Sequence, residues 1–282
     1  MKNNTMLPLF YQNPVSLDSS LHRNLSLKRD FGFNFAKGVN AVPVNIFEFP
    51  ELCHVYPIAF SPDENALPVA ILGLRDNENL FVDTKGRWDQ VYIPAYVRRY
   101  PFIFGEMPDS EKLTLCVDFT TEIIVEDNSQ LFFDVEGKPT ELASNALEFC
   151  KSYHSAVSQT SEFSKLLIDL DMLTQREAKI DLSDGSKINF SGFKIIDEEK
   201  FASLNTSTFN YLRDQGYLAW IYAHLFSGSK WRSLAKRLDR LSSHFDSNFI
   251  LPKETVLDAF ESLKQNNTLD SKGINSGNTN IG

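Results

Sequence analysis

The stretch Gly137-Lys138-Pro139-Thr140 divides the chain into two parts with different hydrophobic patterns. Before it, short apolar runs are bounded by proline and glycine, which is typical of buried strands. After it, apolar residues recur at intervals of three and four, as on one face of a helix; they are Leu142, Ala146, Phe149, Cys150, Tyr153 and Val157. The sequence therefore predicts an α+β fold, with a β-rich N-terminal half followed by a mainly helical C-terminal half with an inserted β-hairpin.

The N-terminal region, residues 1–136, contains several short predicted strands. Residues 31–35 alternate with period two, and the other runs are continuously apolar. The predicted strands cover residues 31–35, 56–60, 68–74, 79–83, 102–104 and 113–117. A short helix is predicted within residues 44–54 and a helical turn over 94–100, where Pro94 stands near its first position.

The helical region, residues 137–264, continues its period of three and four through residues 163–173. An Asp184-Gly185 pair between two alternating runs is a strong hairpin signal, and a hairpin is predicted at residues 177–196. Further helices are predicted at 206–216, 218–225 and 231–241, the first capped by Thr206 or Ser207 and ended by Gly216. Residues 265–282 lack apolar anchors, and we expect them to form a disordered tail.

Composition places the 282-residue chain among globular proteins. Hydrophobic residues make up 42% and charged residues 23%, and the aromatic content of 12% is enough for a sizeable core. The net charge is −9 and the isoelectric point is about 5.1. Because nucleic-acid binding needs a basic field, we expect no nucleic-acid partner.

The three cysteines, Cys53, Cys116 and Cys150, are far apart and odd in number. They show no zinc spacing, so we expect buried, reduced thiols, no metal and no cofactor. The N-terminus lacks the apolar stretch of a secretory signal, and no run approaches the ~18 apolar residues of a membrane span. These features predict a cytoplasmic protein without a transmembrane segment; export by a non-classical route is left open.

The most distinctive stretch is Leu80-Phe81-Val82-Asp83-Thr84-Lys85-Gly86-Arg87-Trp88-Asp89-Gln90-Val91-Tyr92-Ile93-Pro94-Ala95-Tyr96-Val97-Arg98-Arg99-Tyr100-Pro101-Phe102. It combines aromatic residues, two prolines and paired arginines. Other characteristic pieces are Pro8-Leu9-Phe10-Tyr11, Val42-Pro43-Val44, Glu48-Phe49-Pro50, Tyr56-Pro57-Ile58, Ile71-Leu72-Gly73-Leu74, Ser191-Gly192-Phe193, Asp197-Glu198-Glu199-Lys200 and Ile221-Tyr222-Ala223-His224-Leu225.

With these pieces in order, the chain resembles the SapC family of bacterial proteins from Pro8 to about Leu238. The family is named for a surface-layer-associated protein, so the resemblance implies a bacterial origin and a link to surface-layer proteins. An unrelated transporter permease has the same name, and the lack of predicted membrane spans excludes that meaning. No set of catalytic residues comes with the family.

The aromatic and arginine-rich stretch also contains the predicted binding residues. Guanidinium groups bind carboxylates and phosphates bidentately, so a ligand site is predicted here; its residues are Arg75, Trp88, Tyr96, Arg98, Arg99 and Tyr100. The alternative is that these arginines have a structural role and bind no ligand. We favour this interpretation because arginines often stack on aromatic rings in folded proteins. In that case the arginines pair with Asp76, Asp83 or Asp89 and stack on Tyr96, Tyr100 or Trp88.

Other chemical motifs have simpler interpretations. His224 lies between Ile221 and Leu225 and is predicted to be a packed histidine. Cys53 and His54 are neighbours whose side chains should point apart. His244-Phe245-Asp246 has the form of an iron triad, but no second histidine follows it, so we reject that site. Asp197-Glu198-Glu199 suits a helix start. No hydrolase, P-loop, Rossmann or zincin motif occurs, and no catalytic residue is predicted.

The last predicted helix is basic, unlike the rest of the chain; its basic residues are Lys230, Arg232, Lys236, Arg237 and Arg240. Such a helix can contact a membrane, nucleic acid or an acidic partner, whereas the favoured interpretation is a solvated face.

Taken together, the sequence predicts a soluble, non-enzymatic accessory protein linked to surface-layer or cell-surface biology, which acts by binding an unknown protein partner. The alternative is a small-molecule or anion-binding protein, or an enzyme of unknown reaction, centred on Trp88, Arg98 and Arg99.

Overall fold

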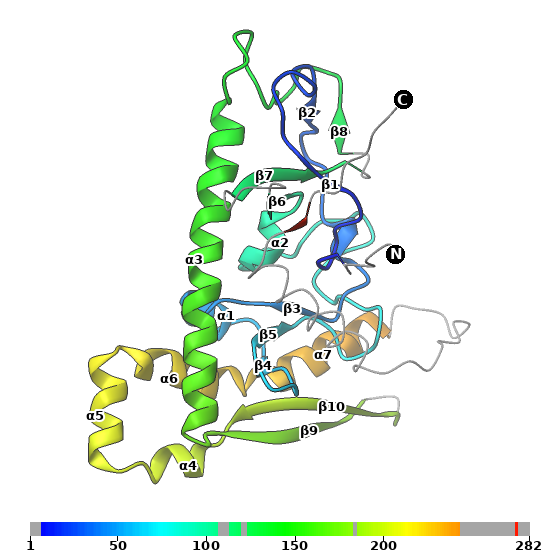
Figure 1. The fold of residues 1–282 in the computed structure, drawn as a ribbon. Helices are drawn as coiled ribbons and strands as arrows, with labels where there is room; N and C mark the ends of the chain where they lie inside the picture. Colours follow the sequence, from blue (N-terminus) through cyan, green and yellow to red (C-terminus); the bar gives the residue numbers. More distant parts are fainter. Residues whose placement is uncertain (1–6, 107–112, 120–122, 183–184, 243–273, 276–282) are drawn as a thin grey trace, which may run out of the picture. The chain divides into compact units, whose positions relative to one another are not determined.

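The computed structural model describes residues 7–106, 113–119, 123–182, 185–242 and 274–275 (Figure 1). Its contacts divide the chain into two compact units. The first unit comprises Met1–Gly32, Arg98–Val157 and Ser262–Gly282, and the second comprises Phe33–Val97 and Ser158–Glu261. The long helix α3 (Glu141–Asp169) contributes its first part to the first unit and its last part to the second.

The first unit is built on a four-stranded sheet. Its strands lie in the order β1 (Pro14–Ser16), β7 (Leu113–Asp118), β6 (Phe102–Glu106) and β11 (Ile274–Asn275). The neighbours pair antiparallel except for β11, which runs parallel to β6. A smaller sheet pairs β2 (Ser26–Leu27) with β8 (Ile124–Val125). The core between the sheets and α3 contains Phe102, Val117, Phe132 and Cys150, all 7% exposed or less.

The second unit contains an antiparallel five-stranded sheet. Its order is β3 (Ala41–Pro43), β5 (Pro68–Ile71), β4 (Ile58–Phe60), β10 (Lys187–Ile196) and β9 (Leu173–Asp181). The hairpin predicted at residues 177–196 is confirmed as β9 and β10, and β4 and β5 also pair antiparallel. β10 is bulged between Phe190 and Phe193, where Gly192 has a φ of 82°, so both rings can contact Trp231.

Short helices and turns connect these strands. They are η1 (Asn34–Ala36), η2 (Ile46–Glu48), α1 (Phe49–Leu52) and α2 (Ala95–Arg99). The C-terminal half adds α4 (Glu198–Ala202), α5 (Thr206–Asp214), α6 (Tyr217–Ser227) and α7 (Lys230–Ser242). The short helix expected within 44–54 and the helical turn at 94–100 are thus confirmed, and so is the α+β class.

Side-chain caps fix two of the helix starts. Asp197 accepts hydrogen bonds from the backbone N–H groups of Glu199 (3.1 Å) and Lys200 (3.2 Å), so the acidic run begins a helix as expected. The cap of α5 is Asn205 rather than Thr206 or Ser207, because its Oδ1 accepts from the N–H of Thr208 at 2.9 Å. Gly216, with a φ of 77°, ends α5 as expected.

Two predicted strands are wrong. Residues 31–35 bend at Gly32, whose φ is 69°, and then enter η1. Residues 79–83 form no strand, because the side chain of Asn79 accepts a hydrogen bond from the N–H of Phe81 at 2.9 Å and draws the backbone into a turn. Only an isolated bridge between Val82 and Trp88 remains there.

The helical period predicted to continue to residue 173 ends earlier, since α3 stops at Asp169 and Leu173 begins β9. The domain boundaries predicted at 136–137 and 264–265 rest on the sequence pattern and stay a prediction. Apart from Ile274–Asn275, the expected tail at 265–282 lies outside the described residues.

Of the helices in the described ranges, none is both long and apolar enough to cross a membrane.

Candidate functional site

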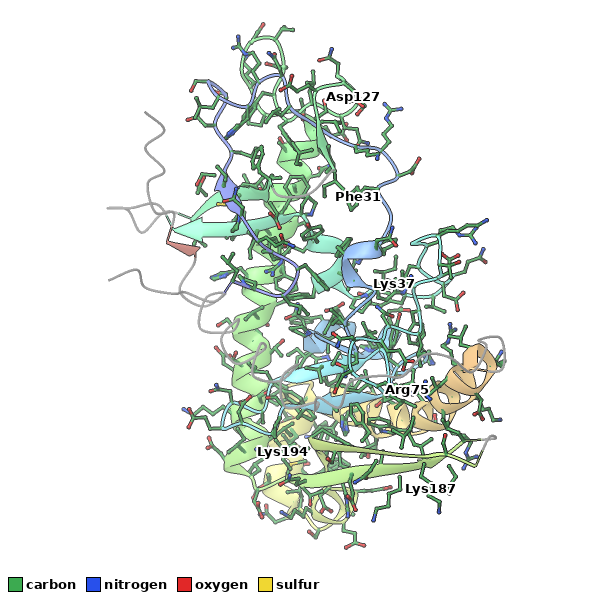
Figure 2. The ribbon with its side chains drawn as sticks, turned by 90° about the vertical axis from the view of Figure 1, so that its right-hand side faces the viewer. Phe31, Lys37, Arg75, Asp127, Lys187 and Lys194 are labelled. Atoms are coloured by element: carbon green, nitrogen blue, oxygen red, sulfur yellow. The ribbon has the colours of Figure 1, made fainter. Side chains whose placement is uncertain are left out.

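The six predicted binding residues are divided between the two units, and each group is described by itself. Arg75, Trp88 and Tyr96 belong to the second unit, whereas the stretch Arg98-Arg99-Tyr100 belongs to the first. Arg75 lies on the loop after β5 (Figure 2), where it contacts Glu78 at 3.9 Å. Tyr96 is fully buried and is therefore a core residue.

The paired arginines face different surroundings, as expected for neighbours on a helical turn. Arg98 is exposed, and its guanidinium carbon lies 5.3 Å from the ring centre of Phe149. Arg99 is only 4% exposed and lies over the rings of Tyr153 at 4.4 Å and Tyr11 at 5.7 Å. The favoured stacking interpretation thus agrees with these contacts, although the rings differ from those named from the sequence.

Tyr100 and its surroundings hold the first unit together. Its hydroxyl donates to Asp118 at 3.5 Å, and its ring lies 5.3 Å from that of Tyr11. The buried Asp118 carboxylate also accepts from the backbone N–H groups of Gln12 (2.9 Å) and Asn13 (3.0 Å). The cavity beside Arg99 has a volume of about 10 Å³, room for no more than one water molecule. These contacts fit a structural role.

The second unit has a larger cleft, which we call the Trp88 cleft. Its volume is about 430 Å³. It is lined by Leu80, Phe81, Val82, Asp83, Arg87, Trp88, Asp89, Gln90, Arg237 and Leu241. The predicted site therefore contributes Trp88 to a cleft whose lining arginines are Arg87 and Arg237 instead of Arg98 and Arg99.

The apolar wall of the Trp88 cleft is held rigidly. Trp88 is 8% exposed, stacks on Phe81 with ring centres 6.4 Å apart, and meets the edge of Phe33 at 5.6 Å. Its indole N–H donates to the hydroxyl of Tyr56 at 3.1 Å, and that hydroxyl donates to the carbonyl of Tyr92 at 2.6 Å. Burial raises the pKa of Tyr56, so its hydroxyl stays protonated and keeps donating.

The buried side chain of Glu48 forms hydrogen bonds with the segment that follows Trp88. Glu48 is 6% exposed and accepts hydrogen bonds from the Tyr92 hydroxyl (3.0 Å), the Ala95 N–H (2.6 Å) and the Asn45 N–H (3.0 Å). It therefore joins the start of η2 to the segment leading into α2. This role of Glu48 could not be predicted from its neighbours in sequence, because Tyr92 and Ala95 lie more than forty positions away.

Two arginine–aspartate pairs form the polar rim of the cleft. Nε and Nη2 of Arg87 lie 2.8 and 2.7 Å from Oδ2 of Asp83. Hydrogen bonds from the Arg87 backbone N–H and side chain hold the pKa of Asp83 below its ordinary value. Asp83 was one of the three acidic partners named in the structural alternative, and here it pairs with Arg87.

The second pair joins distant parts of the chain. Arg237 on α7 donates from Nη2 to Asp89 and from Nη1 to the carbonyl of Leu80 at 3.2 Å. Its guanidinium also lies 4.4 Å from the ring centre of Phe81. The hydrogen bond from Arg237 lowers the pKa of Asp89. Arg237 was predicted only as part of the basic helix and not as a cleft residue, although its place three residues after the buried Leu234 puts it beside the inner face of α7.

The other candidate residues have structural surroundings. His224 is 3% exposed, its ring lies 5.2 Å from that of Phe60, and burial lowers its pKa to about 3. Neither ring nitrogen has a hydrogen-bond partner within the described ranges. Cys53 is buried and donates to the carbonyl of Pro50 at 3.2 Å, whereas His54 is exposed, so the two do point apart.

Metal ligands were also considered. The part of the chain that the structure describes contains no group of three or more histidine, cysteine, aspartate or glutamate residues able to hold a metal ion. His244-Phe245-Asp246, rejected above as an iron site, lies outside the described residues.

The fold and the Trp88 cleft define an α+β protein with an aromatic surface cleft edged by arginine–aspartate pairs. A sequence model of the SapC family matches residues 17–234, and the chain belongs to this family. No curated protein and no solved structure matches the chain.

Proposed function

We propose that this SapC protein is a non-enzymatic accessory protein of surface-layer or cell-surface biology, which binds a protein partner at the Trp88 cleft. The surface-layer link rests on the family alone. The observation that carries the binding role is the composition of the cleft, where Trp88, Phe81 and two arginines lie together. Tryptophan and arginine are the residues most enriched among those that dominate protein–protein binding energy.

The charge arrangement of the rim favours a protein partner over a simple anion. Asp83 and Asp89 already neutralise Arg87 and Arg237. A small anion would have to compete with these carboxylates, whereas a polypeptide can offer donors and acceptors to both members of each pair. The pairs then fix the partner's orientation, which is the usual role of charged groups at an interface.

The second candidate is a small polar ligand bound in the Trp88 cleft, whereas the anion site expected at Arg98 and Arg99 stays a prediction. The volume of about 430 Å³ favours it, because small-molecule sites commonly occupy ~300–1,000 Å³. The cytoplasmic location expected from the three reduced cysteines belongs to the same proposal.

The test uses a variant that fills the cleft without disturbing its pairs. Gln90 is exposed on the cleft lining, so Gln90→Trp should obstruct the cleft while the fold is kept. The matched control is Gln159→Trp, at an exposed position on α3 in the same unit. Each protein is used for a quantitative pull-down from its native cell and for a metabolite-binding screen.

We expect a defined protein to be captured by the wild type and by Gln159→Trp but lost with Gln90→Trp. Equal capture by both variants would show that the cleft is not the binding site. A metabolite that binds the wild type and is excluded by Gln90→Trp, without a protein partner, would assign the cleft to the second candidate. Conversion of any metabolite by the wild type would contradict the non-enzymatic role.

A further inference from the structure

Helix α7 carries a row of exposed basic side chains, which we call the α7 stripe. It consists of Arg232, Lys236 and Arg240, spaced by four residues and all exposed. Residues four apart lie on one face of a helix, and a rise of ~1.5 Å per residue extends the stripe over ~12 Å. The stripe is thus a straight line of positive charge.

The orientation of α7 is fixed by its opposite face. Leu234 and Leu238 are 2% and 1% exposed, and the ring of Trp231 lies 5.3 and 5.0 Å from those of Phe190 and Phe193 on β10. Because these residues anchor the helix in the core, the stripe cannot turn inward. The sequence favoured a solvated basic face on this helix, and the docking of its apolar residues agrees with that interpretation.

The charge of the stripe contrasts with the molecule around it. The chain has a net charge of −9, yet α7 has five basic residues and a single acidic one, Asp239. Among the basic residues, Arg237 is turned toward the cleft and paired with Asp89. Like charges four residues apart repel each other along a helix by about 0.2–0.5 kcal/mol per pair, so an anion lying against the stripe would relieve this repulsion.

We propose that the α7 stripe docks the protein on an anionic membrane surface. A row of exposed positive charges suits a flat array of phosphates, which can meet all three side chains at once. Lys and Arg near an anionic leaflet each contribute to such binding. This inference does not depend on the function of the Trp88 cleft.

The experiment is co-sedimentation of the full chain with lipid vesicles. One set contains only phosphatidylcholine, and the other contains equal parts of phosphatidylcholine and phosphatidylglycerol. We expect binding to the second set only, and we expect it to be lost between 0.1 and 1 M salt, where the screening length falls from ~10 to ~3 Å. Wild-type protein that does not bind the anionic vesicles, or binds them equally in high salt, would overturn the proposal.

Two triple variants locate the interaction. Arg232→Gln, Lys236→Gln and Arg240→Gln together should weaken binding roughly 100-fold, since each basic residue near the surface contributes roughly a factor of five. Glutamine is a good helix former, so α7 should remain folded. The control replaces three exposed basic residues of the β9–β10 hairpin with glutamine, Arg176, Lys179 and Lys187, the last of which begins β10 at the far end of the hairpin (Figure 2).

The two triple variants carry the same net charge, so a general electrostatic effect would weaken both equally. Equal losses would therefore overturn the proposal, and a loss confined to the stripe variant supports it. Retention of the wild type on immobilised poly-glutamate, lost with the stripe variant and accompanied by no vesicle binding, would assign the stripe to an acidic protein and also overturn the membrane proposal.

Discussion

Replacing Trp88 tests whether the wall of the Trp88 cleft is part of the folded core. The indole is 8% exposed, stacks on Phe81 and donates a hydrogen bond to Tyr56 at 3.1 Å. Trp88→Ala removes the ring contacts and leaves a cavity, which costs about 3–5 kcal/mol for a buried tryptophan. The Tyr56 hydroxyl still donates to the Tyr92 carbonyl, so no buried donor is left without a partner.

A second substitution separates packing from hydrogen bonding. Trp88→Phe keeps an aromatic ring against Phe81 and Phe33 but removes the indole N–H. We expect it to cost about 0.5–1.5 kcal/mol, the usual contribution of one hydrogen bond. The exposed Phe226, with 66% of its surface accessible, provides a control, and Phe226→Ala should change stability by no more than about 0.5 kcal/mol.

The assay is urea denaturation followed by far-ultraviolet circular dichroism, which does not depend on the tryptophan that is removed. A shift in midpoint at constant slope reports a change in the free energy of unfolding. If Trp88→Ala costs less than about 1 kcal/mol, the indole is a surface residue and the reasoning about the wall is wrong. That result would instead strengthen a direct binding role for Trp88.

Four further predictions follow from buried groups and chain ends. Arg99→Ala should cost about 2 kcal/mol through its lost ring contacts, whereas Arg98→Ala should cost no more than about 0.5 kcal/mol; equal thermal shifts would contradict this. Burial lowers the pKa of His224 to about 3, so the unfolded chain takes up a proton first and stability falls as the pH drops from 6.5 toward 3. His224→Leu should therefore abolish about 2 kcal/mol of the loss between pH 7 and pH 5, and an unchanged pH profile in urea melts would refute it. Thiol titration after denaturation should find all three cysteines free, and a disulfide in protein isolated from cells would exclude a reduced compartment. Deleting residues 265–282 should leave the melting temperature unchanged, since only two described residues there pair with β6; a clear loss would show that the tail docks.

Part of the fold could be predicted because its signals are local. The apolar period of three and four predicted α3, and the Asp184-Gly185 pair between two alternating runs predicted the hairpin of β9 and β10. Two strand predictions made in the same way were wrong, because a side-chain hydrogen bond or a glycine changed the direction of the backbone. Asn79 turned an apolar run into a loop, and Gly32 bent an alternating one.

The candidate site was predicted only in part. Trp88 and the pairing of an arginine with Asp83 were expected, because both lie within one short stretch. The stacking partners of Arg98 and Arg99 were not, since Phe149 and Tyr153 come from a helix some fifty residues further along the chain.

The sequence by itself determined the α+β class, the family, the acidic character and the basic last helix, because composition, motifs and periodicity are properties of neighbouring residues. Only the tertiary structure decided which charges and rings meet. Arg237 reaches Asp89 across 148 positions of sequence, and the Glu48 carboxylate gathers donors from two separate segments. Such contacts depend on the path of the chain in space, which packing of the whole core determines and local pattern does not.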